Sequence, residues 1–363
     1  MLRSAVFAIL LAVLAKNFAS SFKFRSIMGQ TLSSSNFFFY GKKHFTHKGY
    51  VRHIKDYTST VQTSALALDG LKDGVNLDGR VVVITGANSG LGKEVATYSA
   101  AKGAKVYMLC RTKSKAEAAR EEIIKTTGND KVEVVLVDVS ELEQIRTAAK
   151  EIQSKEQKIH ALVCNAGVLV KEKKLTKEGY EATFASHLLG GSYLLSKLLI
   201  PQVKADEEGR IIFTTSGGMY NFPLPSWPVL SGTDEKLKFD GTNAYAYAKR
   251  GQVLLAERWS KEYPEIPIVP AHPGWSDTPA VDEAFGDAKK YLQPLRTPWE
   301  GAEGIAWLVG TAKKNIRSGE VYLDRTVQPK HIAGLFYSSG SYTKNTPSEV
   351  DAFMSKLQEA AGI

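Results

Sequence analysis

Residues 85–92 read TGANSGLG, and they follow the short β-branched run RVVVIT at 80–85. A glycine-rich turn between a strand and a helix is typical of sites that bind a pyrophosphate, because free N–H groups and the helix dipole favour anions there. Gly86 permits the tight turn, Gly90 lets the backbone approach a phosphate, and Gly92 allows the helix to pack closely on the strand. The stretch therefore predicts the first strand–turn–helix unit of a dinucleotide-binding fold.

Strand-like and helix-like segments alternate from this turn to residue 325. The expected strands are 105–109, 131–137, 159–163, 210–215, 266–270 and 319–323, and the expected helices are 94–102, 114–126, 141–155, 176–200, 243–263 and 298–310. Such alternation predicts an α/β fold with a parallel sheet and helices on both faces, because parallel strands need crossover connections. We expect a single Rossmann-type, doubly wound domain over 77–325 that binds ligands at the carboxyl ends of its strands. The tail, 326–363, is expected to carry a helix near 347–361.

The basic residues are unevenly distributed along a chain of 363 residues with a formal net charge of +9. Residues 1–55 contain nine Lys or Arg and no Asp or Glu. Removing these nine from the 47 basic residues leaves 38, equal to the 38 acidic residues, so the body is neutral. A neutral body argues against a nucleic-acid-binding surface, whereas a basic arm indicates targeting or contact with a membrane.

The arm, 1–55, carries several targeting signals that its sequence does not separate. The apolar run 5–15 has 11 residues, fewer than the roughly 20 that a membrane-spanning helix needs. It suits a secretory signal, an interfacial anchor or part of a mitochondrial transit peptide. If translation starts at Met28, the sequence MGQTLS fits an N-myristoylation pattern. The aromatic run 37–40 beside Lys42 and Lys43 suits a membrane interface, the alternative being that these rings pack on the folded body.

The two cysteines, Cys110 and Cys164, lie inside apolar runs. Two cysteines form neither a disulfide framework nor a closed zinc site, so we expect buried reduced thiols and no bound metal.

The residues after the second expected strand indicate which dinucleotide binds. An acid about 20 residues past the glycines binds the 2′-hydroxyl of NAD, whereas an arginine accommodates the 2′-phosphate of NADP. Here Arg111 lies 19 residues beyond Gly92, and no acid accompanies it in CRTK at 110–113. The sequence therefore favours NADP(H) over NAD(H).

Three residues farther along the chain suggest acid–base chemistry. Tyr245 and Lys249 are spaced i, i+4, so on a helix they share a face. The ordinary pKa of tyrosine, about 10, is too high for efficient proton transfer near neutrality, and a neighbouring cation lowers it. Ser216, which follows an expected strand, can hold a carbonyl oxygen.

Together these motifs resemble the short-chain dehydrogenase/reductase family over about 77–325. TGANSGLG matches its TGxxxGxG turn, 165–167 its NAG motif, and 273–278 its PG…T segment. The resemblance implies that Tyr245 is the general acid/base, that Lys249 lowers its pKa and binds the nicotinamide ribose, and that Ser216 positions the substrate. The expected cofactor-binding residues are Gly86, Asn88, Ser89, Gly90, Leu91, Gly92, Arg111, Asp138, Val139, Asn165, Ala166, Gly167, Tyr245, Lys249, Pro273, Gly274, Trp275 and Thr278. The expected catalytic residues are Ser216, Tyr245, Lys249 and His187.

His187 is a departure from the family pattern. The family places an asparagine there, which shapes the helix and holds a water that relays protons to the lysine. A histidine can also relay protons, but it is bulkier and can be charged at mildly acid pH. Two hypotheses follow: an active oxidoreductase, or a cofactor-binding pseudoenzyme or redox-sensing module with little turnover.

The stretch between Ser216 and Tyr245 bears on the substrate. Its prolines exclude a regular helix, so we expect a loop beside the substrate pocket. Its apolar residues, Met219, Tyr220, Phe222 and Trp227, suggest a small lipophilic carbonyl or alcohol as substrate. The alternative is that they pack beneath the loop. The family resemblance also allows for a homodimer.

Overall fold

The computed structural model describes residues 24–56, 74–279, 281–282, 286–332 and 342–363. The strands are β1 (Val81–Thr85), β2 (Lys105–Cys110), β3 (Val132–Leu136), β4 (Ala161–Cys164), β5 (Arg210–Thr214), β6 (Ile268–Ala271), β7 (Val321–Leu323) and β8 (Thr326–Gln328). The larger helices are α2 (Phe24–His44), α3 (His47–His53), α4 (Gly90–Ala101), α5 (Lys113–Thr127), α6 (Leu142–Lys155), α8 (Leu195–Ala205), α10 (Gly241–Glu262), α12 (Pro298–Gly310) and α13 (Pro347–Ala361).

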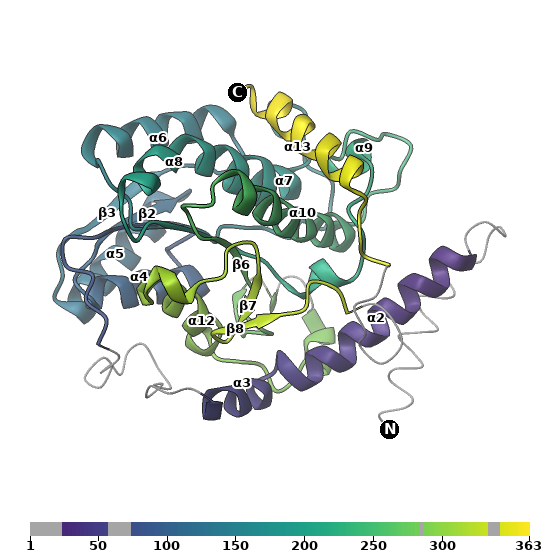
Figure 1. The fold of residues 1–363 in the computed structure, drawn as a ribbon, viewed down its shortest axis with the longest axis horizontal. Helices are drawn as coiled ribbons and strands as arrows, with labels where there is room; N and C mark the ends of the chain where they lie inside the picture. The colour runs from purple at the N-terminus through teal and green to yellow at the C-terminus, as the bar shows by residue number, and fades with distance from the viewer. Residues whose placement is uncertain (1–23, 57–73, 280, 283–285, 333–341) are drawn as a thin grey trace.

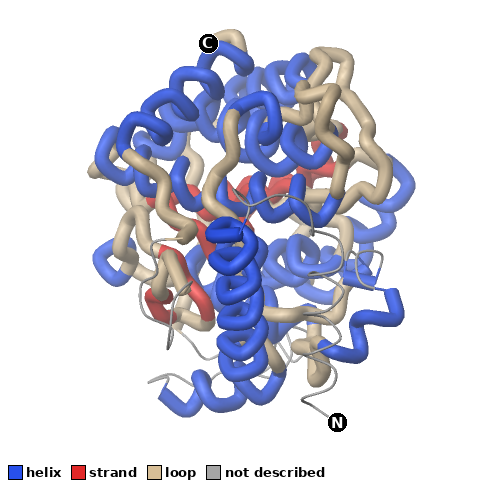
Figure 2. The backbone as a smooth tube through the Cα atoms, turned by 90° about the vertical axis from the view of Figure 1, so that its right-hand side faces the viewer, coloured by secondary structure: helices blue, strands red, loops and turns tan. Residues whose placement is uncertain are grey.

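These strands form one sheet in the order β3-β2-β1-β4-β5-β6-β7-β8. The seven strands from β1 to β7 pair in parallel, and β8 pairs antiparallel with β7. Helices α6, α8 and α10 cover one face, and α4, α5 and α12 cover the other (Figure 1). Figure 2 shows the strands enclosed between these helical layers. The predicted doubly wound α/β fold is therefore confirmed.

The central strand β1 shows why this sequence forms a two-sided sheet. All five of its residues, VVVIT, are buried, as expected for a parallel strand covered on both faces. Val81 and Val83 belong to the core under α6 and α10, whereas Val82 and Ile84 belong to the core under α4 and α12. The alternation of side chains along the strand thus divides one apolar run between two cores.

Local signals set the ends of the later helices. Thr297 caps α12 by accepting from the backbone N–H of Glu300, while the Glu300 carboxylate accepts from the backbone N–H of Thr297. Thr346 and Glu349 form the same capping box at α13, which confirms the helix predicted near 347–361. Each helix has proline in its first turn, where the missing N–H is not needed.

The structure differs from the sequence prediction at two places in the body. The helix expected at 176–200 begins at α7 (Ala182–Phe184), continues as a π-helix over Ala185–Leu194 and ends with α8. Strand β8 lies beyond residue 325, in the segment that the sequence assigned to the tail. The hairpin between β7 and β8 turns on Asp324 and Arg325, a pair without glycine or asparagine, so turn composition did not indicate it.

The N-terminal helices α2 and α3 pack on the body as part of the fold. Phe45 and Tyr40 are buried in a third core cluster with Tyr220, Trp275 and residues of β7, and Phe37 and Phe38 pack against it. Packing on the body, one of the two alternatives for the aromatic run 37–40, is what the structure shows for Phe37, Phe38 and Tyr40, whereas Phe39 is exposed. The signals within 1–23 lie outside the described residues. None of the described helices has the length and apolar character needed to cross a membrane.

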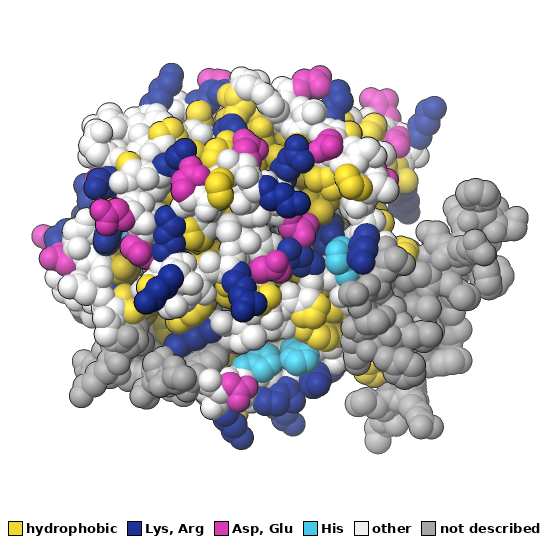
Figure 3. Space-filling model, in the orientation of Figure 1, with side chains coloured by type: hydrophobic (Ala, Val, Ile, Leu, Met, Phe, Trp, Pro, Cys, Tyr) yellow, Lys and Arg dark blue, Asp and Glu magenta, His cyan; other side chains and the backbone are white. Residues whose placement is uncertain are grey.

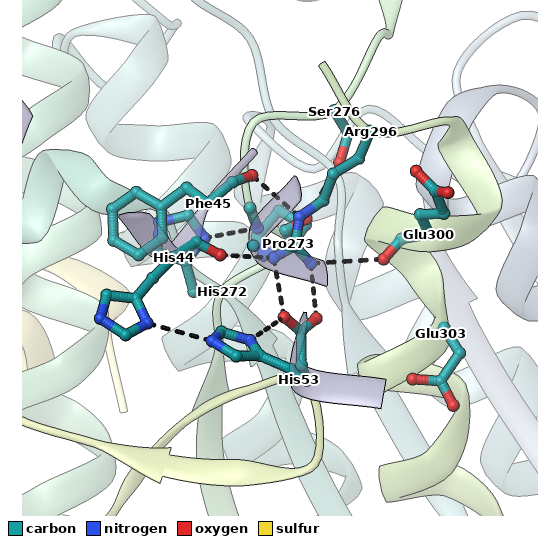
Figure 4. Close-up of polar contacts among 12 residues, drawn as sticks. His44, Phe45, His53, His272, Pro273, Ser276, Arg296, Glu300 and Glu303 are labelled. Carbon is teal, nitrogen blue, oxygen red and sulfur yellow. Dashed lines mark hydrogen bonds and ion pairs between the residues drawn. The ribbon is translucent and has the colours of Figure 1, made fainter. Parts of the chain in front are cut away.

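A buried ion pair fastens these helices to the body (Figure 4). The Arg296 guanidinium pairs with both carboxylate oxygens of Asp324, and the side chains are 0% and 2% exposed. The same guanidinium donates 2.8 Å hydrogen bonds to the backbone oxygens of Phe45 and His44. His53 of α3 contacts the Asp324 carboxylate at 2.7 Å. Burial raises the pKa of Asp324, but Arg296 and His53 outweigh it and hold this pKa below its ordinary value.

We expect Arg296→Met to lower the free energy of unfolding by about 3–5 kcal/mol, because it leaves a buried carboxylate without its main partner. Adding Asp324→Asn should recover part of this loss. Arg258→Met is the matched control, since the ion pair of Arg258 with Asp351 is exposed and such pairs contribute about 0–1 kcal/mol. Urea unfolding gives the free energy of unfolding of the wild type, the two single variants and the double variant. Equal losses of this free energy for Arg296→Met and Arg258→Met would contradict the prediction.

Candidate active site

A cavity of about 760 Å³ opens at the carboxyl ends of β1, β4, β5 and β6. Every candidate site residue named from the sequence lines it, except Gly92. These residues come from segments as far apart as 86 and 278, yet most follow the end of a parallel strand, while Tyr245 and Lys249 lie on α10 and His187 on the helix over Ala185–Leu194. The sheet order places β1 beside β4 while β2 and β3 lie on the other side of β1. This reversal creates the crevice in which doubly wound sheets bind ligands.

The glycine turn has the geometry that a dinucleotide requires. Gly86 and Gly90 adopt φ values of +66° and +51°, which glycine accepts at low energy. A Cβ on Gly92 would lie 2.3 Å from the Gly86 carbonyl oxygen, so Gly92 contributes through close packing and not as cavity lining. Ser89, the N-cap of α4, forms no side-chain capping bond. The first turn of α4 is therefore open to an anion, and the residues present fit a pyrophosphate.

Asn165 holds the ends of β1 and β4 together. Its backbone N–H and that of Ala166 donate to the Thr85 hydroxyl at 2.9 and 2.8 Å. Its side-chain amide donates to the Thr85 carbonyl at 3.1 Å. The NAG segment thus fixes the glycine turn from beneath, and Gly167 lies directly against His187, where a Cβ would overlap the imidazole ring.

Two cations lie at the end of the cavity next to β2 and β3. Arg111 follows β2 with its side chain 67% exposed, and it lies 3.5 Å from the Asp138 carboxylate. Lys115 also lines this end. Sequence reasoning missed Lys115, although its position four residues after Arg111 and inside the next helix was a usable signal.

Ser216, Tyr245 and Lys249 meet at the other end. Ser216 begins the 3-10 helix that follows β5, and its hydroxyl accepts from the Gly218 N–H at 3.1 Å. The Lys249 ammonium lies 5.4 Å from the centre of the Tyr245 ring and donates to the Thr214 carbonyl at 2.6 Å. Burial raises the pKa of Tyr245, and a hydrogen bond to Ser216 opposes this shift. Burial lowers the pKa of Lys249 to about 7.

His187 lies in the π-helix, with its ring edge-on to Tyr245 at 5.2 Å. Its Nε2 lies 3.0 Å from the Val168 N–H and 2.8 Å from the Val168 carbonyl oxygen, and no partner is found for its buried Nδ1 among the described residues. Burial and the charge of Lys249 hold the pKa of His187 well below its ordinary value, so the ring is neutral. Its backbone carbonyl accepts from Ser192 and Gln252. The lowered pKa argues against the charge at mildly acid pH that the sequence left open.

The loop after β6 forms another side of the cavity. Gly274 has φ +72°, and a Cβ there would lie 2.2 Å from the Arg296 guanidinium. Trp275 is buried beneath α2. Thr278 lies beside Gly90 at the cavity edge, since a Cβ on that glycine would lie 3.6 Å from the threonine methyl.

The apolar loop residues do not line the cavity. Met219 and Tyr220 are fully buried in the third core cluster, and Trp227 packs on Tyr180 and Phe184. Packing beneath the loop is thus the alternative that the structure shows for these three. The apolar lining comes instead from α2 and from the segment after β6, at Phe37, Phe38, Trp275, Val281 and Leu292.

Both cysteines are buried free thiols. Burial raises the pKa of Cys110 to about 11 and that of Cys164 to about 12. Thiols in this state are poor nucleophiles, which weighs against the redox-sensing alternative through cysteine. Among the described residues no cluster of three or more His, Cys, Asp or Glu could hold a metal ion.

The lowered pKa of Lys249 predicts a pH-dependent effect on stability. Between about pH 7 and the ordinary value of 10.5, the unfolded chain binds a proton that the folded chain does not. The destabilisation from burying this cation is therefore complete below pH 7 and fades as the pH rises to 10.5. Lys249→Met should raise the free energy of unfolding by about 1–3 kcal/mol at pH 6.5, after its lost hydrogen bond is subtracted, and by less at pH 9.5.

The control is Lys150→Met, which replaces an exposed lysine of α6. Urea unfolding at both pH values gives the two differences. A Lys249→Met effect that is absent, or that grows as the pH rises, would show that this ammonium is not buried at an energetic cost.

Comparisons with known proteins place this geometry in a family. The family model described as short chain dehydrogenase matches residues 80–289. The chain is 35% identical over 323 residues to human dehydrogenase/reductase SDR family member 12, covering 88% of this chain and 95% of the relative. It is 32% identical over 255 residues to human retinol dehydrogenase 11, covering 69% and 79%.

Solved structures share the fold. An Escherichia coli short chain dehydrogenase complexed with NADPH superposes with a TM-score of 0.55 at 21% identity, covering 69% of this chain and 98% of the other. A Mycobacterium paratuberculosis protein gives a TM-score of 0.61 at 21% identity, covering 79% and 95%. With the glycine turn, the strand-end serine and the Tyr–Lys pair gathered around one cavity, the chain belongs to the short-chain dehydrogenase/reductase family, whose members are NAD(P)-dependent oxidoreductases of alcohols and carbonyls.

Proposed function

We propose that this chain is an NADP-preferring oxidoreductase that transfers hydride between C4 of the nicotinamide and the carbonyl or alcohol carbon of a lipophilic substrate. The observation that carries the proposal is the arrangement of one cavity. The uncapped first turn of α4 lies along it, Arg111 and Lys115 line one end, and Ser216, Tyr245 and Lys249 line the other.

The side chains at the end of the cavity that holds Ser216, Tyr245 and Lys249 suit proton transfer to a carbonyl oxygen. The bound nicotinamide supplies or accepts the hydride. Tyr245 Oη gives a proton to the substrate oxygen in reduction and takes it back in oxidation, and Ser216 Oγ, which lines the same end of the cavity, orients that oxygen. Lys249, beside the tyrosine ring, stabilises tyrosinate when its ammonium is charged.

Two observations support a lipophilic substrate. The cavity wall beyond Ser216 is built from Phe37, Phe38, Trp275 and Leu292, and apolar pockets with a few polar groups bind apolar ligands in one orientation. Relatives at 32% identity include retinol dehydrogenase 11, whose name gives an apolar alcohol as its substrate.

A peripheral membrane contact through the N-terminal arm is also part of the proposal. Exposed side chains of α2 and α3 include Lys43, Lys48, Val51 and Arg52, and Phe39 is 44% exposed. Lys and Arg side chains gather at the lower edge of Figure 3, where α3 lies in Figure 1. Such a basic edge suits anionic lipid headgroups. A homodimer stays a prediction from the family resemblance.

Tyr245→Phe tests the catalytic assignment. We expect turnover of NADPH with a panel of retinal, steroid ketones, fatty aldehydes and quinones to fall at least about 100-fold, because the proton donor is lost. The NADPH dissociation constant should change less than about twofold. Tyr247→Phe is the control: this ring lies two residues along α10, packs on Phe222 and does not line the cavity. Turnover that survives Tyr245→Phe would reject the assignment.

The same assay separates the alternative function, a cofactor-binding pseudoenzyme or redox-sensing module. The observation behind it is that His187 fills the space beside Lys249 and Gly167, where the family pattern has an asparagine that holds a relay water. A large gain in turnover for His187→Asn would favour the alternative. Unchanged or lower turnover would favour an active enzyme that uses the histidine.

Arg111 tests the cofactor preference. We expect NADPH to raise the melting temperature more than NADH does, because the guanidinium can pair with the 2′-phosphate. Arg111→Ala should raise the NADPH dissociation constant about tenfold or more and leave that of NADH nearly unchanged. Lys113→Ala is the control, as an exposed neighbouring cation that does not line the cavity. Equal shifts with the two cofactors in the wild type would refute the preference.

A further inference from the structure

The N-terminal helix α2 lies outside the segment that the family model matches, yet it lines the same cavity. Its lining residues are Thr31, Ser34, Ser35, Phe37, Phe38 and Phe39. We propose that α2 is a fixed wall of the substrate pocket and that Phe37 determines which apolar carbonyl substrates fit beside Ser216. That the pocket binds a substrate rests on the proposed function. That α2 forms one wall of the pocket can be tested without turnover.

Phe37 touches the catalytic end of the cavity directly. A Cβ on Gly217, the residue after Ser216, would lie 2.3 Å from the Phe37 ring. The phenyl ring therefore rests on the backbone next to the hydroxyl that orients the substrate oxygen. A side chain in this position limits the width of the group attached to the reacting carbon, because pockets discriminate apolar substrates by the volume that they leave.

Trp275 completes the aromatic wall. Its ring centre lies 6.1 Å from that of Phe37, edge to face, and 6.2 Å from that of Phe38. A Cβ on Gly41 would lie 2.4 Å from the same indole, so α2 fits the loop after β6 without a gap. Because Trp275 is one of the expected cofactor-binding residues, the helix and the expected cofactor site share one surface.

Hydrogen bonds and ring contacts attach the carboxyl end of α2 to the body, so that the helix forms a fixed wall of the pocket. Arg296 binds the backbone oxygens of His44 and Phe45, and the Trp275 N–H donates to the Phe45 oxygen at 2.8 Å. The Tyr40 hydroxyl donates to Gln328 of β8. The Phe45 ring lies 4.1 Å from the His272 ring. Sheet, loop and helix are thus connected by buried contacts within two turns of Phe37.

The chemistry of the wall indicates the substrate class. Along α2 the lining changes from hydroxyl side chains at 31–35 to aromatic rings at 37–39. Phe37 and Phe38 share a hydrophobic cluster with Val281 and Leu292, which also line the cavity, and Asn221 adds a polar group to the lining. Aromatic edges and faces pack best against flat apolar groups. We therefore assign to this pocket a carbonyl or alcohol attached to a flat, apolar body.

The first test compares Phe37→Ala and Phe37→Trp in the full chain. We expect Phe37→Ala to shift the ratio of kcat/KM for a bulky diaryl ketone over that for benzaldehyde about tenfold toward the ketone, and Phe37→Trp to shift it in the opposite direction. The NADPH dissociation constant should stay within about twofold in both. Phe222→Ala is the matched control, a part-buried phenylalanine close to Ser216 in sequence that does not line the cavity.

The second test needs no turnover. With NADP⁺ bound, so that no hydride is available, benzophenone serves as an apolar diaryl ketone that labels contacting residues on irradiation. The label should fall in the tryptic peptide 26–42, which contains Phe37, and its half-saturating concentration should change about fivefold or more in the Phe37 variants but not in Phe222→Ala. A melting temperature measured for each variant confirms that it is folded.

The outcomes distinguish the two proposals. Labelling outside 26–42 together with unchanged substrate ratios would overturn the wall while leaving an active oxidoreductase. Labelling of 26–42 that depends on Phe37, in a chain that reduces no carbonyl, would uphold the wall and reject the proposed function. Labelling that depends on Phe37 together with shifted ratios would support both.

Discussion

The contact on which the rest of the site depends is the buried ion pair of Arg296 and Asp324. One guanidinium joins three segments: the end of α2, the loop of Gly274 and Trp275, and the turn between β7 and β8. Burying two charges is expensive unless they pair and the remaining donors find acceptors. Here the carboxylate and the backbone oxygens of Phe45, His44 and Glu300 fill that need. The buried Phe45 ring and the backbone hydrogen bond from Trp275 to Phe45 act together with this contact to hold α2 over the cavity.

The same pair explains an unusual turn. Asp324 and Arg325 have φ values of +50° and +63°, a region that disfavours residues with a side chain and costs about 1 kcal/mol or more for each. Asp324 is held there by Arg296, and Arg325 by the Glu303 carboxylate of α12. The ion pairs thus keep a strained hairpin closed, and the hairpin in turn brings Gln328 to Tyr40 of α2. The residue types at this turn do not favour its backbone conformation. The tertiary ion pairs stabilise that conformation instead.

The difference between local sequence patterns and long-range contacts explains which features could be predicted from the sequence. The parallel strands, the glycine turn and the Tyr245–Lys249 spacing are local patterns with one structural meaning each, and the structure has them as expected. The position of α2 depends on Arg296, 251 residues beyond Phe45, and no pattern within a short window encodes such a contact. For the same reason the apolar pocket was expected from Met219 and Trp227, which the structure buries, while Phe37 and Leu292 supply the lining. The π-helix around His187 contains Gly190 and Gly191, and the expectation of one regular helix over 176–200 did not distinguish it.

The electrostatics of the cavity give the catalytic end a further property. Among the described lining residues Asp138 is the only carboxylate, and it lies beside Arg111, away from Lys249. His187 and His272 both have lowered pKa values and are neutral, so the Lys249 cation has no resident counter-ion. Beyond its hydrogen bond to the Thr214 carbonyl, it is stabilised further when negative charge appears nearby, on the Tyr245 oxygen or on the oxygen of a reacting carbonyl. This interaction is weak in the resting protein and becomes strong when that charge develops. It therefore lowers the activation barrier without strengthening the binding of the substrate in its ground state.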